Sequence, residues 1–346
     1  MCIRDSVERR AVVLMLPLDV QAASVELTEP VAWAELSPVR PSAAAVAEVA
    51  AVLSRAERPA IIAGRGAVLS GAGPALRRLG EATGAVLATS AVANGLFEGD
   101  PFAVGISGGF ASPTAQRLIG EADVVIGFGA ALNVWTTRHG ALLKHATVIQ
   151  VDRDEEAIGA HRPVDLGVVG DARETAEALL EVLAGQQRGD ALGGGARRSM
   201  TLAAEIAAGT WRDEPYEASR DWLDPRALSI ALDEMLPQER IVVVDSGAFM
   251  GYPSRYLRVP DAQGFVFPQA FQCVGLGLGN AIGAAVARPD RLTVAALGDG
   301  GLLMALPDLE TLGRLQLNVL VVIYDDAAYG AEVHHFRPTG MPIGRK

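Results

Sequence analysis

The stretch Leu292-Thr293-Val294-Ala295-Ala296-Leu297-Gly298-Asp299-Gly300-Gly301 is followed, after a helix-like run, by Val319-Leu320-Val321-Val322-Ile323-Tyr324-Asp325-Asp326. The apolar runs 292–297 and 319–324 predict two buried parallel strands, each of which delivers an aspartate at its carboxyl end. Glycines beside Asp299 let a backbone approach an anion closely, and carboxylates on neighbouring strand ends suit Mg²⁺. The stretch therefore predicts a Mg²⁺–diphosphate site. The alternative is an ordinary α/β sheet whose strand ends are acidic.

The spacing of these aspartates is informative, because Asp325 lies 325 − 298 = 27 positions after Gly298. Gly-Asp-Gly followed at about this interval by Asn-Asn resembles the thiamine diphosphate (ThDP) enzymes, in the branch of acetolactate synthase, benzoylformate decarboxylase and pyruvate decarboxylase. The resemblance implies that Asp299, Asp326 and the backbone carbonyl of Ala328 hold the metal. The pair Asp325-Asp326 departs from Asn-Asn. It keeps oxygen ligands but adds negative charge facing an anionic cofactor.

The same resemblance implies cofactor contacts in earlier segments. The junction after the predicted strand 241–245 resembles the element that touches the diphosphate from the opposite side, although Ser246 alone fits a structural turn equally well. Val274 falls where an apolar side chain lies under the thiamine, between its two rings. For Cys273 we expect a small buried residue, because no general base is in view. The predicted cofactor-binding residues are Ser246, Gly247, Ala248, Cys273, Val274, Gly298, Gly300, Gly301, Tyr329 and Gly330.

A candidate acid follows the second strand. Glu332 matches a position where the pyruvate decarboxylase branch uses a glutamate near the substrate, and a carboxylate there could protonate a carbanion. Acetolactate synthases carry an apolar residue at this position, so Glu332 discriminates within the family. The pair His334-His335 has no accompanying metal-ligand spacing, and we expect it to be solvated.

Between residues 41 and 185, apolar runs alternate with helical stretches, which predicts a doubly wound parallel sheet. Gly64-Arg65-Gly66 follows the first run without completing a dinucleotide motif, so it predicts a tight strand-to-helix turn. Asp152 ends the fourth run and could bind a ribose, although a solvated loop aspartate is the more ordinary interpretation. This block resembles the central domain of the ThDP enzymes. FAD stays open as a cofactor here but is not favoured, because the segment 131–139 matches the family's FAD-binding segment poorly.

The resemblance and the composition shifts together predict the domain organisation. Residues 1–40 are a remnant of a pyrimidine-binding domain, in which the segment Ala11–Val20 resembles the closing strand; residues 1–6 have no pattern of their own. Residues 41–185 form the central domain, 186–215 a linker, and 216–346 a diphosphate-binding domain truncated at its carboxyl end. The predicted fold class is therefore α/β, with two doubly wound parallel-sheet, Rossmann-like domains.

The composition excludes several classes of protein. The formal net charge of −11 argues against nucleic acid and an anionic membrane surface as partners, and no apolar run reaches membrane-spanning length. Two cysteines, Cys2 and Cys273, cannot form a disulfide framework, which suits the cytoplasm. The 346 residues, half of them hydrophobic, suffice for two cores.

The sequence thus predicts the ThDP- and Mg²⁺-binding portion of an acetolactate synthase-like enzyme that acts on 2-oxo acids by decarboxylation or carboligation. The resemblance implies a homodimer or homotetramer. It also implies that the glutamate that activates ThDP comes from the first domain of a neighbouring subunit, so we expect this chain alone to be inactive. The alternatives are a flavin- or NAD-binding oxidoreductase and a cofactor-binding protein without catalysis.

Overall fold

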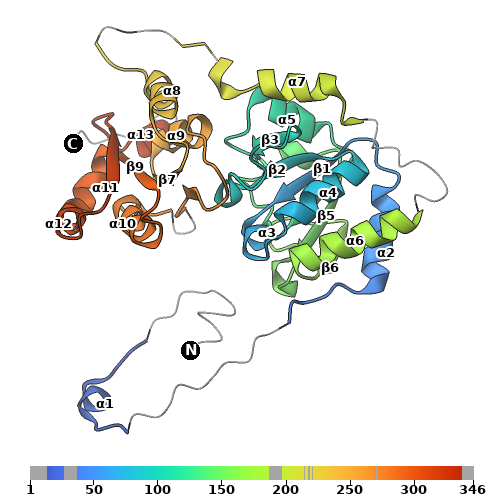
Figure 1. Cartoon of the computed structure of the whole chain (residues 1–346), viewed down its shortest axis with the longest axis horizontal. Coiled ribbons are helices and arrows are strands. Elements are labelled where there is room, and N and C mark those ends of the chain that lie inside the picture. The colour runs from blue at the N-terminus through green and yellow to red at the C-terminus, as the bar shows by residue number, and fades with distance from the viewer. Residues whose placement is uncertain are drawn as a thin grey trace. The chain divides into compact units, whose positions relative to one another are not determined.

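The computed structural model of the chain describes residues 14–26, 37–186, 197–213, 215–216, 219, 221–269 and 272–336. It divides into two compact units, residues 1–38 and 39–346. The second unit contains two parallel sheets, each with helices on both faces (Figure 1). The prediction of two doubly wound α/β domains is therefore confirmed.

The central sheet has six parallel strands in the order β3-β2-β1-β4-β5-β6. The chain therefore runs outward from β1 in one direction and, after β3, returns to β4 on the other side of β1. Such a reversal leaves a crevice at the carboxyl ends of the two central strands. The strands are β1 Pro59–Ala63, β2 Val86–Thr89, β3 Ala103–Ile106, β4 Val124–Phe128, β5 Thr147–Asp152 and β6 Leu166–Val169.

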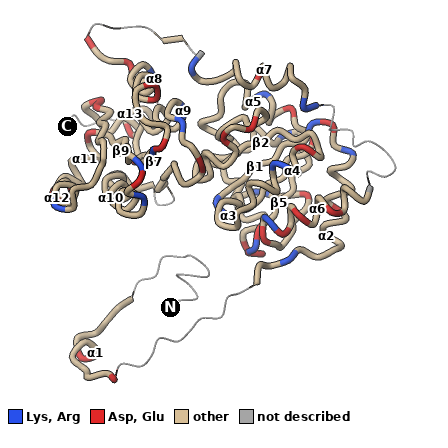
Figure 2. The backbone as a smooth tube through the Cα atoms, in the orientation of Figure 1, with Lys and Arg blue, Asp and Glu red and all other residues tan. Residues whose placement is uncertain are grey.

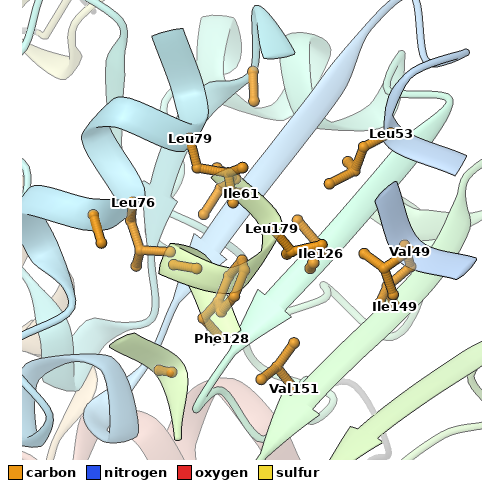
Figure 3. Close-up of a cluster of buried hydrophobic side chains, with 14 of the residues drawn as sticks. Val49, Leu53, Ile61, Leu76, Leu79, Ile126, Phe128, Ile149, Val151 and Leu179 are labelled. Atoms are coloured by element: carbon orange, nitrogen blue, oxygen red, sulfur yellow. The ribbon is translucent and has the colours of Figure 1, made fainter. Parts of the chain in front are cut away.

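Alternate side chains of the central strands enter two separate cores. Ile61, Ile126 and Ile149 point to one face, where they pack against three helices (Figure 3). Ala60, Ile62 and their neighbours point to the other face. These strands are buried on both faces, which explains their continuous apolar sequence. The helices of this domain are α2 Ala43–Leu53, α3 Arg65–Leu69, α4 Gly73–Thr83, α5 Pro113–Gly120 and α6 Ala172–Gln186.

Residues placed in the predicted linker pack on this domain. The helix α7, Met200–Ala208, buries Leu202 in the second core, and the serine hydroxyl of Ser199 caps its first turn. Arg197 donates to the carbonyl of Pro59, and Arg198 donates to the carbonyl of Ala85. These guanidinium groups satisfy backbone oxygens at the beginning of the sheet. The rest of the predicted linker, residues 187–196, lies outside the described residues.

The second sheet has four parallel strands in the order β10-β9-β7-β8. Its chain reversal lies at β7, between β8 on one side and β9 on the other. The side chains of Asp224 and Pro225 start α8, because the Asp224 carboxylate accepts from the N–H of Arg226 and proline is favoured at the first helical position. The elements are α8 Pro225–Met235, β7 Arg240–Val244, α9 Gly251–Tyr256, β8 Phe265–Val266, α10 Gly277–Ala287, β9 Leu292–Gly298, α11 Asp299–Met304, α12 Leu309–Arg314, β10 Val319–Tyr324 and α13 Gly330–Phe336.

The expectation of a strand near the N-terminus is wrong for the residues that can be assessed. Leu18–Ala22 forms a short helix, α1, and the residues from Leu14 to Pro17 belong to no strand. All of them are exposed, because within the described chain no neighbouring strand accepts their backbone hydrogen bonds. A strand without such a partner is not stable in water. Residues 11–13 of the predicted strand, and Cys2, lie outside the described residues.

Charged residues of both signs are interspersed along the helices of both sheet domains (Figure 2). Within the described residues, none of the helices combines the length and the apolar character needed to cross a membrane.

Candidate functional site

The carboxyl ends of three neighbouring strands bring the predicted site residues together. In the parallel pairing of β9 with β10, Gly298 is the partner of Tyr324, so Asp299 and Asp325 follow paired positions. In the pairing of β7 with β9, Val244 is the partner of Ala296, so Asp245 and Ser246 begin at the same edge. This edge contains the chain reversal of the sheet, where α/β proteins bind ligands.

A cavity of about 820 Å³ lies at this edge. It is lined by all but one of the residues that the sequence predicted for the cofactor, the metal and catalysis. These are Ser246, Gly247, Ala248, Val274, Gly298, Asp299, Gly300, Gly301, Asp326, Ala328, Tyr329, Gly330 and Glu332.

Cys273 is the exception, and the expectation that it is buried is wrong. Its side chain is exposed and is not part of the cavity lining, although its neighbours Gln272 and Val274 are. The segment before α10 is an irregular turn that starts with Gln272 at φ +50°. Because successive residues of this turn point in different directions, Gln272 and Val274 line the cavity while Cys273 between them does not, and burial starts again at Gly277 where α10 begins.

The loop after β10 is shaped by its own aspartates. The Asp325 carboxylate accepts a hydrogen bond from the N–H of Ala327 at 2.9 Å, and that of Asp326 accepts one from Ala328 at 3.1 Å. A side chain at Gly330 would collide with the Asp326 carboxylate, so only glycine lets α13 begin this close to it. The helix then presents Glu332 to the cavity from its first turn. His334 is exposed.

The central domain lines the other side of the same cavity, which the sequence did not predict. Ser90, Asn133 and His161 contribute polar groups, and Arg65 contributes a cation to the lining. Asp152 also lines it; burial, with a smaller contribution from the charge of Asp154, raises the pKa of its carboxyl above the usual range. Gly64-Arg65-Gly66 forms the predicted tight turn, since β1 ends at Ala63 and α3 begins at Arg65.

One wall of the cavity, the loop Ser107–Ala111 of the central domain, is fixed by residues of later segments. The Arg255 guanidinium donates to the carbonyl of Gly109 at 2.8 Å, and the Trp211 indole N–H donates to the carbonyl of Phe110 at 2.7 Å. Arg255 also lies 4.2 Å above the ring of Trp211, and burial lowers the pKa of its guanidinium. The ring of Phe110 packs edge-on against Phe267. The cavity is therefore a joint product of both domains.

Aromatic side chains form part of the lining beside β10. Tyr324 stacks between Phe249, at 5.3 Å between ring centroids, and Tyr252, at 6.4 Å. Its hydroxyl is 2.8 Å from that of Ser229. Burial raises the pKa of Tyr324 to about 12, so this phenol stays neutral at physiological pH and serves packing rather than proton transfer.

The lining suits a polar, anionic ligand accompanied by a divalent cation. Two buried polar atoms of lining residues, Ser90 Oγ and Gln269 Nε2, have no hydrogen-bond partner in the described chain, so a ligand or water is needed to satisfy them. Asp299 and Asp326 contribute hard carboxylate oxygens of the kind that bind Mg²⁺. The described residues hold no cluster of three or more histidines, cysteines and acids, so a metal here would rely on two carboxylates and a backbone carbonyl.

Comparison with known proteins agrees with this geometry. Residues 46–179 match the thiamine pyrophosphate enzyme central domain, and residues 245–343 match the thiamine pyrophosphate enzyme C-terminal TPP binding domain. The chain belongs to the thiamine pyrophosphate enzymes. Thiamine pyrophosphate is another name for ThDP, so the family resemblance stated from the sequence is confirmed. Nothing in the comparisons supports FAD.

Individual relatives extend the similarity beyond the two domains. The sulfoacetaldehyde acetyltransferase of Roseovarius nubinhibens is 32% identical over 310 residues, which are 83% of this chain and 51% of that protein. The acetolactate synthase large subunit of Parasynechococcus marenigrum is 29% identical, over 84% of this chain and 46% of that protein. The chain spans about half the length of these curated relatives.

A solved structure agrees on the fold. A Mycobacterium smegmatis protein described as a thiamin diphosphate-dependent enzyme superposes with a TM-score of 0.68 at 21% identity, covering 87% of this chain and 56% of that one. The two family matches fall within the predicted domains 41–185 and 216–346, whose boundaries stay a prediction.

Proposed function

We propose that this chain forms the ThDP- and Mg²⁺-binding portion of an enzyme that acts on 2-oxo acids by decarboxylation or carboligation. One observation carries the proposal: Asp299, Asp326 and Ala328 line a single cavity at the carboxyl ends of paired strands. Membership of the thiamine pyrophosphate enzymes supports the cofactor.

In this proposal the carboxylates of Asp299 and Asp326 and the carbonyl of Ala328 hold the metal. The C-terminal half of the cavity contributes three acids, with Glu332 as the third, while the Arg65 guanidinium in the lining comes from the central domain. A diphosphate would be repelled by these acids unless a divalent cation lay between them. Ser246, Gly247 and Ala248 would contact the diphosphate from the end of β7. Asp325-Asp326, where the family resemblance implies Asn-Asn, makes the metal more necessary here.

Bound ThDP supplies the electron sink that 2-oxo acid chemistry requires, and the protein supplies orientation and proton transfer. Val274 would support the rings from below, since its side chain faces the cavity from the turn before α10. Glu332 would hold or deliver a proton near the substrate, because it enters the cavity from the first turn of α13. The loop Ser107–Ala111 would close the opposite side and limit access of water.

A second candidate is acetyl-group transfer involving sulfoacetaldehyde. It is favoured by the names of relatives that are 32% identical to this chain, including proteins of Roseovarius nubinhibens and Rhodobacter capsulatus. The two candidate functions differ in the substrate but share the same cofactor-binding site. An assay of the complete protein with pyruvate alone, a second 2-oxo acid, or sulfoacetaldehyde would separate them by the product formed.

The metal assignment can be tested on this chain by calorimetric titration of ThDP with and without Mg²⁺. Asp299→Ala should abolish Mg²⁺-dependent ThDP binding while leaving the circular dichroism spectrum unchanged, because it removes one of two carboxylate ligands. Asp308→Ala is a matched control, since Asp308 is an exposed aspartate that does not line the cavity. Equal ThDP affinity in wild type and Asp299→Ala would refute the assignment.

A further inference from the structure

Asp245 is a buried carboxylate whose partners are backbone N–H groups. It directly follows β7 and is 0% exposed. Its Oδ1 accepts hydrogen bonds from Ser246 at 2.8 Å and Gly277 at 3.1 Å, and its Oδ2 accepts one from Gly275 at 3.0 Å. We find no Lys, Arg or His side chain paired with it in the described part of the chain. Backbone N–H groups are therefore what hold this side chain in place.

These donors come from both sides of one turn. Gly275 lies at φ +92°, a conformation that glycine adopts without strain, and Gly277 is the first residue of α10. Val274, which lines the cavity, immediately precedes this pair. The Asp245 carboxylate thus ties the end of β7 to the turn that carries Val274.

Close packing adds a third segment to this junction. A side chain on Gly301 would collide with Oδ2 of Asp245, and one on Gly277 would lie 2.6 Å from its Cβ. The carboxylate therefore sits against the first turn of α11, which begins at Asp299. Three segments that line the cavity meet at one side chain that does not line it itself.

We infer that Asp245 is a positioning residue, which fixes the location of Val274 relative to Asp299. It thereby sets the distance between the binding site of the cofactor rings and the binding site of the diphosphate. The inference rests on the proposed function for the identity of the ligand. An asparagine would keep one oxygen for Ser246 and Gly277, but its NH₂ group would face the N–H of Gly275. Two donors facing each other would loosen the turn without removing either metal ligand.

The test compares two ligands on the full chain in the presence of Mg²⁺. ThDP occupies both the ring-binding site and the diphosphate-binding site, whereas inorganic pyrophosphate occupies the diphosphate-binding site alone. For Asp245→Asn we expect the dissociation constant of ThDP to rise about tenfold, since one buried donor loses its acceptor, and that of pyrophosphate to change by less than about twofold. Asp261→Asn is the control, because Asp261 is paired with Arg291 outside the cavity. It should change neither constant.

A second measurement needs no ligand. Hydrogen exchange of the peptide covering 272–278 should be faster in Asp245→Asn than in wild type and in Asp261→Asn, because the amide of Gly275 loses its acceptor and the turn around it loosens. If Asp245→Asn does not fold, Asp245→Glu replaces it; the additional methylene displaces the carboxylate from its three donors at unchanged charge, and the same results are expected.

The outcomes separate the inference from the proposed function. Unchanged exchange in a folded variant, unchanged ThDP affinity, or equal weakening of ThDP and pyrophosphate would each overturn the positioning role. If the wild-type chain binds neither ligand, the proposed function fails, and the exchange experiment alone then decides whether Asp245 holds the turn.

Discussion

Two buried aspartates beside the second sheet, Asp233 and Asp245, are stabilised in opposite ways. Asp233 on α8 is 4% exposed and is paired with Arg240, Arg212 and Arg258. Asp245 is equally buried but is held by backbone N–H groups. Away from the cavity the fold neutralises a buried carboxylate with cations. At the cavity it uses main-chain donors, which fix geometry without bringing a bulky cation beside the proposed metal ligands.

The largest expected effect concerns Asp233, the aspartate that is paired with arginines. Asp233→Ala should lower the free energy of unfolding by about 3–5 kcal/mol, because it leaves the Arg240 guanidinium, 2% exposed, without its carboxylate. Asp245→Ala leaves only neutral N–H groups without an acceptor, so its loss should be smaller, about 1–3 kcal/mol. Urea unfolding of both variants measures the difference. Equal losses would show that the two environments do not differ energetically.

A smaller effect is expected where two neutral groups satisfy each other. Tyr324→Phe should lower the free energy of unfolding by about 1 kcal/mol, since the Ser229 hydroxyl loses one of two hydrogen bonds while its bond to the carbonyl of Pro225 and the aromatic stack remain. Ser70→Ala, at a part-buried serine outside this pair, is a control for the loss of one hydroxyl.

The same tyrosine gives a pH dependence of known sign. Burial raises the pKa of Tyr324 to about 12, above the ordinary 10.0, so the fold favours the neutral phenol. Its contribution to stability is complete below pH 10 and is lost as the pH rises towards 12. An ultraviolet difference titration of wild type against Tyr324→Phe should show one phenol ionising near pH 12. Ionisation near pH 10 would contradict the buried environment.

The smallest effect is expected for Asp152, whose carboxylate accepts from the N–H of Asp154 and is stabilised only weakly by the charge of Arg153. Burial raises the pKa of its carboxyl, so the stability that it contributes is present below pH 3.8 and is lost as the pH rises through the folded value. At neutral pH the charged form is unfavourable, and Asp152→Asn should raise the free energy of unfolding by up to about 0.5 kcal/mol.

The control for the Asp152 prediction is the same stability comparison at low pH. The gain from Asp152→Asn should vanish near pH 3, where the wild-type carboxyl is protonated in both the folded and the unfolded state. A variant that is less stable than wild type at pH 7 would show that Asp152 is instead held by favourable contacts.

Much of the fold could be predicted because its central strands are uniformly apolar. β1, β4 and β5 are buried on both faces, so their sequences differ clearly from the helices between them. β3, β6 and β8 have no such continuous apolar run, since they are short or half-exposed edge strands, and Gly105 and Gly167 interrupt the first two. Their strand conformation depends on pairing with the next strand, which is tertiary information.

The candidate site also has residues that the local sequence could predict and residues that it could not. Asp299 and Asp326 could be predicted because a glycine-rich turn and an acid at a strand end are visible locally. Asp245 is also an acid at a strand end, directly after β7. Its importance, however, lies in hydrogen bonds from residues 30 and 32 positions later. The contributions of the central domain, such as Asn133 and Ser90, follow from which loops meet across the cavity, and no local pattern encodes that meeting.

The register between β9 and β10 predicts where related sequences can differ in length. Asp299 and Asp325 lie together because Gly298 is paired with Tyr324, not because 27 residues separate Gly298 from Asp325. Residues added in the crossover that includes α12 would lengthen a surface connection and leave the pairing intact, whereas one residue added within either strand would turn its side chains to the opposite face. Insertions should therefore accumulate between Leu309 and Leu317. A sequence search that requires a fixed interval would overlook relatives whose strand ends still meet.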